Sequence, residues 1–381
     1  MPLFKKLNQS EFIELAYLKG WASGKPEIKI ETLPKVSFYS MGKRDSHPSV
    51  EVRTASSILV TLPEVVIQGS SFGLIYEDKI IPGGLAHSPV WMSSEFIDAG
   101  NGFYQYTVKK LVAIDDTNPC LLGFICHWGH FFIDALDRLL KYQELNLLDR
   151  LMLVADPDFL DLHPQVDATF AVPQVTQLMR LLGIRLDPSR VFPVLKTHDY
   201  VVSNMVTCTL EAQKPAISSG NFVKLRERVL GHVDRIDDDK KSLVFVGRSE
   251  VTKRLILNQD TLCRYLEQAK GCRVIFPEHL SLDEAINIFS SASRVILPVG
   301  SAKFNLIFCR PGTKVICITP MGYTSSKSGL VMMIRHMCHA LGLILAFYEC
   351  EIERAPILLN SNLLISKSDI RRILAEFDDL S

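Results

Sequence analysis

Apolar and polar residues follow two different periods along this chain. From Pro34 to Thr107, short runs alternate apolar and polar side chains between Gly, Pro and Ser breaks, which predicts a strand-rich beginning. From Trp128 to Leu148 the apolar spacing is that of a helix, and the strand-like LMLVA follows from Leu151. This alternation of helices and strands predicts a parallel sheet with helices on its faces.

The alternation continues through the rest of the chain. The expected helices lie at 174–182, 221–232, 259–268 and 282–291, and the expected strands at 200–209, 243–246, 273–276, 295–297 and 314–318. The succession after residue 242 is typical of a nucleotide-binding domain. The most apolar late stretch, Gly329 to Phe347, includes an Arg and two His, so we expect a buried helix there rather than a membrane span.

The most charged window runs from Asp234 to Lys241, between an expected helix and an expected strand. A chain of 381 residues with 47% hydrophobic content is longer than one hydrophobic core usually extends. We therefore expect two domains, one over residues 1–233 and one over residues 242–381. A solvated loop within one domain is the alternative interpretation of the charged window.

Composition excludes several classes of function. The 42 basic and 42 acidic residues cancel, which argues against nucleic-acid binding and against a polybasic membrane patch. Nine cysteines at irregular spacing, without a CxxC pair, predict buried free thiols in a reducing compartment. The first residues are too polar for a signal peptide. We expect a cytoplasmic protein without a transmembrane segment, and leave peripheral association with a membrane open.

Two short apolar strands between Arg294 and Ile318 bracket a turn of small residues, Gly300, Ser301 and Ala302. In an open parallel sheet, the loops that leave the carboxyl ends of strands carry the ligand contacts, and small residues leave the backbone accessible there. A helix that begins at such a turn directs backbone N–H groups at an anion. The pattern predicts a ligand-binding crevice.

A cationic segment follows the strand that ends at Val246. Arg248 comes directly after it, and Lys253, Arg254 and Asn258 follow. Arginine binds phosphate well because its planar fork donates two parallel hydrogen bonds. The segment suits a diphosphate or a carboxylate, and ordinary surface charge is the alternative.

His130 and Asp134 lie four residues apart, one turn of a helix, so both side chains share a face. A carboxylate that holds an imidazole fixes its tautomer and raises its basicity, as a general base requires. A solvated helix face and core histidines are the alternatives. A zinc site with His127 is less supported, because no nearby Cys or third His completes it.

Asp156 and Asp158 follow the strand at Leu151. An Asp-x-Asp pair in this position can hold a divalent ion. Because Pro157 separates the two and apolar residues follow, we favour capping of a turn or a helix start.

Five features in the second half of the chain recur in a fixed order. They are Arg248, Arg254 with Asn258, Pro277-Glu278, Gly300-Ser301-Ala302 with Asn305, and Pro311-Gly312. Upstream stand CHWGHFFIDALDRLL and LMRLLGIRLDPSRVF. In these motifs, residues 118–320 resemble glycosyltransferase family 61, in particular its members that act on capsular or surface polysaccharides.

The resemblance implies a GT-B-like α/β fold, with two Rossmann-like domains facing a cleft and a β-rich N-terminal extension. It implies inverting, metal-independent transfer of a sugar from a nucleotide-sugar, first of all a UDP-sugar, to a glycan or other hydroxyl acceptor in polysaccharide biosynthesis. No cofactor is implied. His130 would be the catalytic base and Asp134 its orienting partner, with residues 1–233 presenting the acceptor.

The same resemblance implies a set of donor-binding residues in the C-terminal domain. They are Arg248, Arg254, Asn258, Glu278, Gly300, Ser301, Ala302, Lys303 and Asn305. The two arginines and the backbone N–H groups of the turn would stabilise the departing charge, with Lys303 as a further cation. Asn305 is as well suited to brace the turn as to contact the donor.

Two alternatives stay open. Val299 and Phe304 depart from the family pattern around the small-residue turn, which would suit a non-catalytic module that binds a nucleotide-sugar or a glycan. A different α/β enzyme, such as a nucleotide-sugar epimerase or a dinucleotide enzyme, is the other. The lack of a GxGxxG motif after any strand counts against it.

Overall fold

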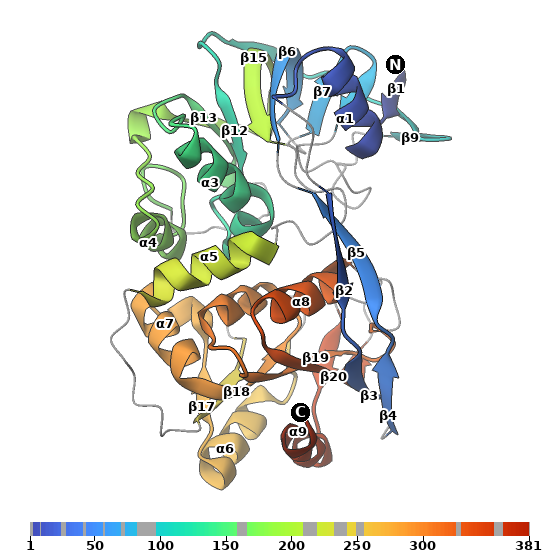
Figure 1. Cartoon of the computed structure of the whole chain (residues 1–381), viewed down its shortest axis with the longest axis vertical. Coiled ribbons are helices and arrows are strands. Elements are labelled where there is room, and N and C mark those ends of the chain that lie inside the picture. Colours follow the sequence, from blue (N-terminus) through green and yellow to red (C-terminus); the bar gives the residue numbers. More distant parts are fainter. Residues whose placement is uncertain are drawn as a thin grey trace. The chain divides into compact units, whose positions relative to one another are not determined.

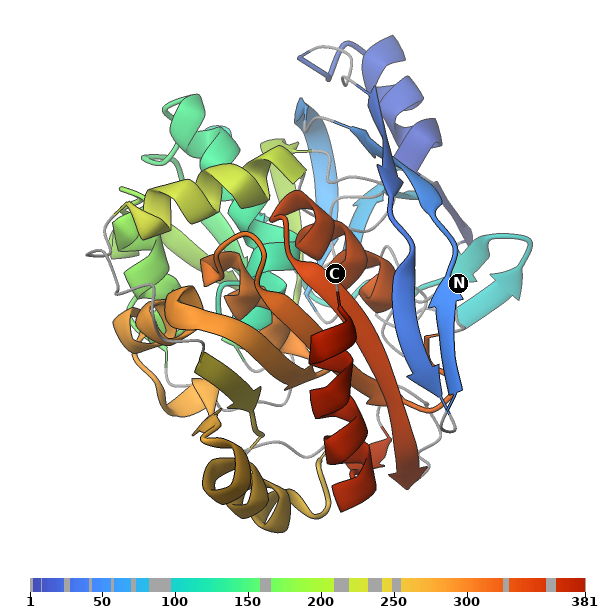
Figure 2. The ribbon, with the colours of Figure 1, turned by 60° about the horizontal axis from the view of Figure 1, so that its bottom comes forward.

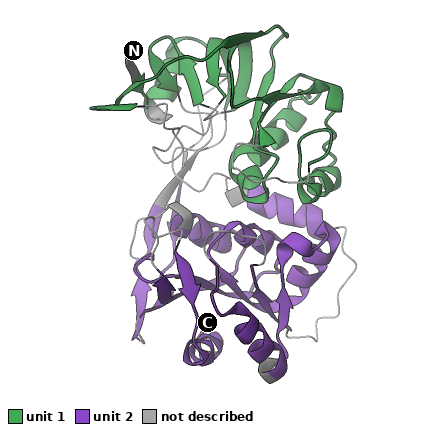
Figure 3. Ribbon diagram, turned by 180° about the vertical axis from the view of Figure 1, so that it is seen from behind, with its two compact units in different colours: residues 1–29, 54–218 green, residues 30–53, 219–381 purple. Residues whose placement is uncertain are grey.

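The structure is a computed structural model with a mixed α/β architecture (Figure 1). It describes residues 3–7, 9–23, 28–40, 43–55, 58–69, 73–81, 97–157, 166–208, 219–231, 242–248, 255–324, 329–353 and 361–380. The chain divides into two compact units, which Figure 3 colours separately. Unit 1 comprises residues 1–29 and 54–218, and unit 2 comprises residues 30–53 and 219–381. The boundary residues 29/30 and 53/54 lie within β2 (Ile28–Leu33) and β5 (Val50–Ala55), which pair with each other.

Unit 1 contains a parallel sheet of the expected α/β kind. Its strands, in spatial order, are β14 (Val191–Val194), β13 (Met152–Ala155), β12 (Cys120–Gly123) and β15 (Asp199–Cys208). α3 (Leu136–Glu144) and α4 (Pro173–Leu181) follow β12 and β13 along the chain. The chain moves outward from β12 to β14 and then returns to β15 on the other side of β12. The sheet therefore has a topological switch point between β12 and β15.

The same sheet continues beyond β15 as the strand-rich region that the sequence predicted. Its further strands, in spatial order, are β6 (Leu59–Gln68), β7 (Gly73–Tyr76), β8 (Lys79–Ile81), β1 (Leu3–Lys6), β10 (Phe103–Gln105) and β9 (Ile97–Gly100), and β11 (Leu111–Ile114) pairs with β15. α1 (Gln9–Leu18) contributes Phe12 and Ala16 to the core beneath these strands.

Unit 2 is built on a second parallel sheet. In spatial order its strands are β17 (Arg273–Ile275), β16 (Ser242–Val246), β18 (Ala292–Pro298), β19 (Lys314–Pro320), β20 (Ile344–Glu353) and β3 (Val36–Ser40), with antiparallel β4 (Lys43–His47) at the edge and β21 (Asn362–Leu364) paired to β20. Along the chain β16 comes before β17 and β18, but in the sheet it lies between them. The switch point of this sheet is therefore between β16 and β18.

Helices cover both faces of the unit 2 sheet. α6 (Gln259–Lys270) and α9 (Lys367–Asp379) lie on one face, and α7 (Leu282–Ser291) and α8 (Gly329–Ala340) lie on the other (Figures 1 and 2). α5 (Ser219–Leu230) packs on α7 and α8. Strands buried on both faces explain the almost unbroken apolar runs in this half of the sequence.

The division into units differs from the expected boundary at residues 233–242. The charged window 234–241 lies outside the described residues. The unit boundary falls before α5, because α5 packs on helices of unit 2. Residues 30–53 join unit 2 because β3 pairs in parallel with β20, more than three hundred residues later in the chain.

The expectation of one buried helix from Gly329 to Phe347 was wrong in its second half. α8 ends at Ala340, Gly342 takes a left-handed φ of 65°, and β20 begins at Ile344. Glycine adopts this conformation without steric cost and commonly ends a helix. The aromatic and β-branched residues that follow favour a strand.

All nine cysteines are free thiols and eight of them are buried, which confirms the expectation of buried free thiols. No helix in the described ranges is both long enough and apolar enough to cross a bilayer.

Candidate functional site

The segment after β12 in unit 1 carries the two histidines singled out above. α2 (Trp128–His130) begins shortly after the strand ends, and His127 is its N-cap residue. The His127 Nδ1 atom accepts a hydrogen bond from the backbone N–H of His130, at 3.2 Å. Because β12 borders the switch point of its sheet, both histidines follow a strand end where α/β proteins commonly bind ligands.

His130 and Asp134 are in direct contact. The His130 Nδ1 atom lies 2.8 Å from Asp134 Oδ2, and the two side chains are 12% and 4% exposed. With Nδ1 protonated and donating to the carboxylate, Nε2 carries the lone pair, which is the tautomer that a general base needs. The alternative of a solvated helix face is wrong, because Asp134, Asp137 and Arg138 are all buried.

The sequence predicted an ordinary α-helical turn for this pair, and the structure differs. Residues Phe131–Ala135 form a π-helix, η1, between α2 and α3. π-helical turns are rare and occur often at functional sites. Arg138, in α3, steadies the turn, since its Nη1 donates to the carbonyls of Asp134 at 3.2 Å and Leu122 at 3.1 Å. Arg138 thus links the π-helix to β12.

In unit 2, two of the predicted donor-binding residues meet at the switch point. Arg248 follows β16 and Gly300 follows β18, and these strands are neighbours. The Arg248 Nη1 donates to the carbonyl of Val299 at 3.4 Å. A Cβ atom added to Gly300 would lie only 2.5 Å from the same Nη1, so any larger residue at 300 would collide with the guanidinium. Glycine leaves room for the arginine to cross the backbone of the turn, and a larger residue would displace this flexible side chain.

Gln259 fixes the backbone of Arg248. Its Oε1 accepts from the Arg248 N–H at 2.7 Å, and its Nε2 donates to the Arg248 carbonyl at 2.8 Å. This two-point contact, from the first residue of α6, sets the direction in which the Arg248 side chain leaves the strand end. Sequence reasoning missed Gln259, because nothing in its local pattern distinguishes it from a surface glutamine.

The residues after Gly300 form a 3-10 helix, η5 (Ser301–Phe308). Lys303 is buried, its Nζ donating to the Gly300 carbonyl at 3.4 Å and lying 4.5 Å from the Phe304 ring centroid. Asn305 is also buried, and its Nδ2 donates to the Ala302 carbonyl at 3.2 Å. Both side chains thus brace the turn from its inner side.

The model of the family Glycosyltransferase 61 matches residues 128–316 of the chain. The chain belongs to glycosyltransferase family 61. The matched region begins at α2 and ends within β19, so it includes both the His130 pair and the Arg248 turn. Membership makes the protein a glycosyltransferase, with a sugar donor and an acceptor as its substrates. No curated protein matches the chain.

The remaining predicted donor-binding residues of this glycosyltransferase are less closely tied to the Arg248 turn. The Asn258 side chain contacts the backbone of Ile365, with Nδ2 donating to its carbonyl at 2.6 Å and Oδ1 accepting from its N–H at 3.3 Å. Glu278 is exposed on the 3-10 helix η4 (Pro277–His279). Arg254 lies outside the described residues.

The two aspartates considered as metal ligands have separate outcomes. Asp156 is buried and accepts a hydrogen bond from the backbone N–H of Lys196 at 3.1 Å, so it braces the loop after β14. Asp158 lies outside the described residues. Within the part of the glycosyltransferase that the structure describes, no three His, Cys, Asp or Glu side chains gather in a way that could hold a metal ion.

Proposed function

We propose that this glycosyltransferase moves a sugar from a nucleotide-sugar to a hydroxyl acceptor in one inverting displacement, without a metal ion. The observation that carries the proposal is the Arg248 guanidinium lying across Gly300 at the switch point of the unit 2 sheet. In open parallel sheets, ligands bind outside the carboxyl ends of the strands at this point. A permanent cation beside a small-residue turn suits a diphosphate.

On the donor side, Arg248 takes the role that a metal ion has in other sugar transferases. As the bond between the anomeric carbon and the diphosphate oxygen breaks, the electron pair stays on the leaving group and negative charge builds up there. Gln259 fixes the backbone of Arg248, so the guanidinium is already in place to stabilise this charge. The backbone N–H groups at the start of η5 are proposed to assist.

On the acceptor side, His130 is the proposed base. Its Nε2 takes the proton of the acceptor hydroxyl while the acceptor oxygen forms a bond to the anomeric carbon. Asp134 keeps Nδ1 protonated and stabilises the imidazolium that results. Attack from the side opposite the leaving group inverts the anomeric configuration.

The architecture proposed for this reaction is GT-B, in which two Rossmann-like domains face a cleft. The presence in each unit of parallel strands with a topological switch point supports it. A UDP-sugar donor, a glycan acceptor and a place in polysaccharide biosynthesis are parts of the same proposal. The cytoplasmic location and a peripheral membrane association stay predictions from the sequence.

The second candidate function, a module that binds without turnover, was suggested by Val299 and Phe304. Both side chains are buried, at 1% exposure each, and so contribute to the core beneath the turn. Their departure from the family pattern does not remove Arg248 or Gly300. Catalysis is therefore the function that the geometry supports better.

The proposal is tested by incubating the enzyme with UDP-sugars and a panel of aryl glycosides as acceptors, with and without EDTA. We expect a product whose anomeric proton, by NMR, shows the configuration opposite to that of the donor, formed at the same rate in EDTA. Retention of configuration would overturn the displacement. Loss of activity in EDTA would overturn the metal-free donor site, and binding of a UDP-sugar without any product would favour the non-catalytic module.

A further inference from the structure

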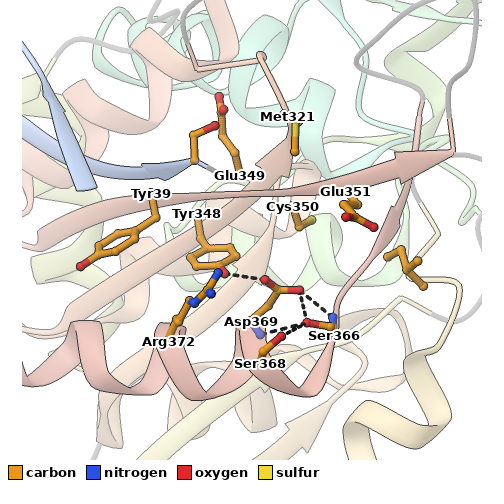
Figure 4. Close-up of a pocket in the computed structure, with 12 residues that line it drawn as sticks. Tyr39, Met321, Tyr348, Glu349, Cys350, Glu351, Ser366, Ser368, Asp369 and Arg372 are labelled. Atoms are coloured by element: carbon orange, nitrogen blue, oxygen red, sulfur yellow. Dashed lines mark hydrogen bonds between the residues drawn. The ribbon is translucent and has the colours of Figure 1, made fainter. Parts of the chain in front are cut away.

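A pocket lies in unit 2, away from Arg248 and Gly300. It has a volume of about 300 Å³ and is lined by residues at the carboxyl ends of β19, β20 and β3 and in the first turns of α9 (Figure 4). Because the strands are parallel, it opens at the same edge of the sheet as the Arg248 turn. β19 separates β18 from β20, which places the pocket roughly 10 Å along the sheet from Gly300.

Two tyrosines form one wall of the pocket. Tyr39 of β3 and Tyr348 of β20 are paired in register on neighbouring parallel strands, so their side chains share one face of the sheet. Their rings are nearly parallel, at an interplanar angle of 17° and a centroid distance of 6.2 Å. Figure 4 shows both rings on the side of the sheet that α9 covers. Tyr39 is partly exposed and offers its ring to a ligand.

Polar side chains are fixed around the tyrosines. The Tyr348 hydroxyl donates to Asp369 Oδ1 at 2.6 Å, and Arg372 of α9 lines the pocket beside them. Asp369 in turn accepts from the Ser366 backbone and hydroxyl. A carboxylate and a phenol are thus held together before any ligand arrives, which lowers the entropic cost of binding.

The charge of the lining excludes an anionic ligand. Two carboxylates, from Glu351 and Asp369, and one guanidinium, from Arg372, line the pocket, and the Glu349 carboxylate lies on the other side of β20 from Tyr348 (Figure 4). Burial would raise the pKa of Glu349 and of Asp369, but hydrogen bonds from Thr324 to the first and from Ser366 and Tyr348 to the second hold both below their ordinary values. Both are therefore ionised at neutral pH, and a phosphate group would be repelled.

We propose that this pocket is a subsite for one neutral pyranose ring of a substrate. The apolar face of a sugar packs on a tyrosine ring, and its hydroxyls donate to carboxylates and accept from a guanidinium, which are the groups present here. The volume is at the lower end of the range for small-molecule sites, so it suits one ring rather than a whole nucleotide-sugar. The inference rests on the proposed function for the source of the ring, which is either the donor sugar or a residue of the acceptor glycan.

The test is saturation-transfer difference NMR with methyl pyranosides of glucose, galactose, mannose and xylose, on the full chain. The variants are Arg372→Met and Tyr39→Leu, with Arg371→Met as the matched control. Arg371 and Arg372 are both exposed neighbours in α9, but only Arg372 lines the pocket. We expect at least one pyranoside to bind the wild type and Arg371→Met, and to bind Arg372→Met about tenfold more weakly, with equal melting temperatures.

Two further titrations separate the sources of the ring. If the donor supplies it, a UDP-sugar binds the wild type more tightly than UDP does, and Arg372→Met removes the difference. If the acceptor supplies it, Arg372→Met raises the KM of the acceptor and leaves UDP-sugar affinity unchanged. Two results would overturn the subsite. The first is that no pyranoside binds and that the UDP-sugar binds no more tightly than UDP. The second is that Arg371→Met and Arg372→Met behave alike. UDP affinity itself should be the same in all these proteins, so failure of the subsite is distinguishable from failure of the Arg248 donor site.

Discussion

The two candidate regions of this glycosyltransferase are assembled in opposite ways. In unit 1, His130 and Asp134 are four residues apart on one helical segment, and their side chains contact each other directly. In unit 2, Arg248 and the Val299 carbonyl are 51 residues apart in sequence, and the arginine is held by this carbonyl and by the Gln259 side chain. The first site is local in sequence, and the second exists only once neighbouring strands have paired.

The two regions also differ in the kind of charge they provide. In unit 1, His130 provides an imidazole, the side chain that most often serves as a general acid or base. The guanidinium of Arg248 keeps its charge at all relevant pH values, as binding of a diphosphate requires. In the proposed mechanism, proton transfer and charge stabilisation belong to separate units, so variants should separate the two functions.

The largest effect should come from His130→Ala. General base catalysis contributes about 100-fold or more to a rate, so transfer should fall by at least that factor. An initial-rate assay with a UDP-sugar and an aryl glycoside measures it. His339→Ala, which removes an exposed histidine of α8, is the control and should keep the wild-type rate. Wild-type transfer by His130→Ala would break the assignment of the base to unit 1.

A smaller but still large effect should follow from changing the Arg248 turn. Loss of hydrogen bonds to a charged group costs about 1.5–3 kcal/mol, so Arg248→Ala should weaken UDP binding by about 10- to 100-fold. Gly300→Ala should have a similar effect, because its Cβ would displace the guanidinium. Calorimetry of both single variants and the double variant should give strongly non-additive losses. Additive losses would show that the two residues act independently, and Arg264→Ala on exposed α6 is the control.

Gln259→Leu should have a more moderate effect. It keeps the Arg248 side chain and removes only the two hydrogen bonds from Gln259 to the Arg248 backbone. We expect UDP affinity to fall by a factor of about five, corresponding to about 1 kcal/mol. The pH dependence of transfer should stay that of the wild type, because His130 is untouched. A shifted pH profile in this variant would contradict the assignment of donor binding and proton transfer to separate regions.

The smallest effect concerns the cysteines behind both regions. Burial raises the pKa of Cys126, next to the histidine segment, to about 12, and burial also raises the pKa of Cys309, behind η5. A raised pKa lowers the fraction of reactive thiolate at neutral pH. Iodoacetamide at pH 7, read out by peptide mass spectrometry, should leave both thiols unlabelled in the folded protein and label Cys263 first, because it is the only one of the nine that is not fully buried. Early labelling of Cys126 would show that the core behind His130 opens.

Much of the fold could be predicted from the sequence wherever the signal was local. Helical spacing placed α6 and α7 within a few residues of their bounds, and the pair of His130 and Asp134 followed from their separation of four residues. What could not be predicted depends on distant segments. The parallel pairing of β3 with β20 joins residues from opposite ends of the chain, and no local pattern encodes it.

The same limit explains which features of the candidate site could not be predicted. The hydrogen bonds from Gln259 to Arg248 and the close approach of Arg248 to Gly300 can be seen only in the three-dimensional structure. The π-helix at Phe131–Ala135 was missed because its sequence also suits an α-helix. Lys303 was predicted as a donor-binding cation, and Asn305 either to contact the donor or to brace the turn. In the structure the Lys303 Nζ donates to the Gly300 carbonyl, and the Asn305 Nδ2 donates to the Ala302 carbonyl.

The central claim, that unit 2 binds the donor and unit 1 supplies the base, is tested most directly by one calorimetric comparison. UDP is titrated into the wild type, His130→Ala and Arg248→Ala under the same conditions. The account predicts that His130→Ala binds UDP with wild-type affinity and that Arg248→Ala binds it at least tenfold more weakly. Wild-type affinity in Arg248→Ala, or loss of binding in His130→Ala, would contradict it.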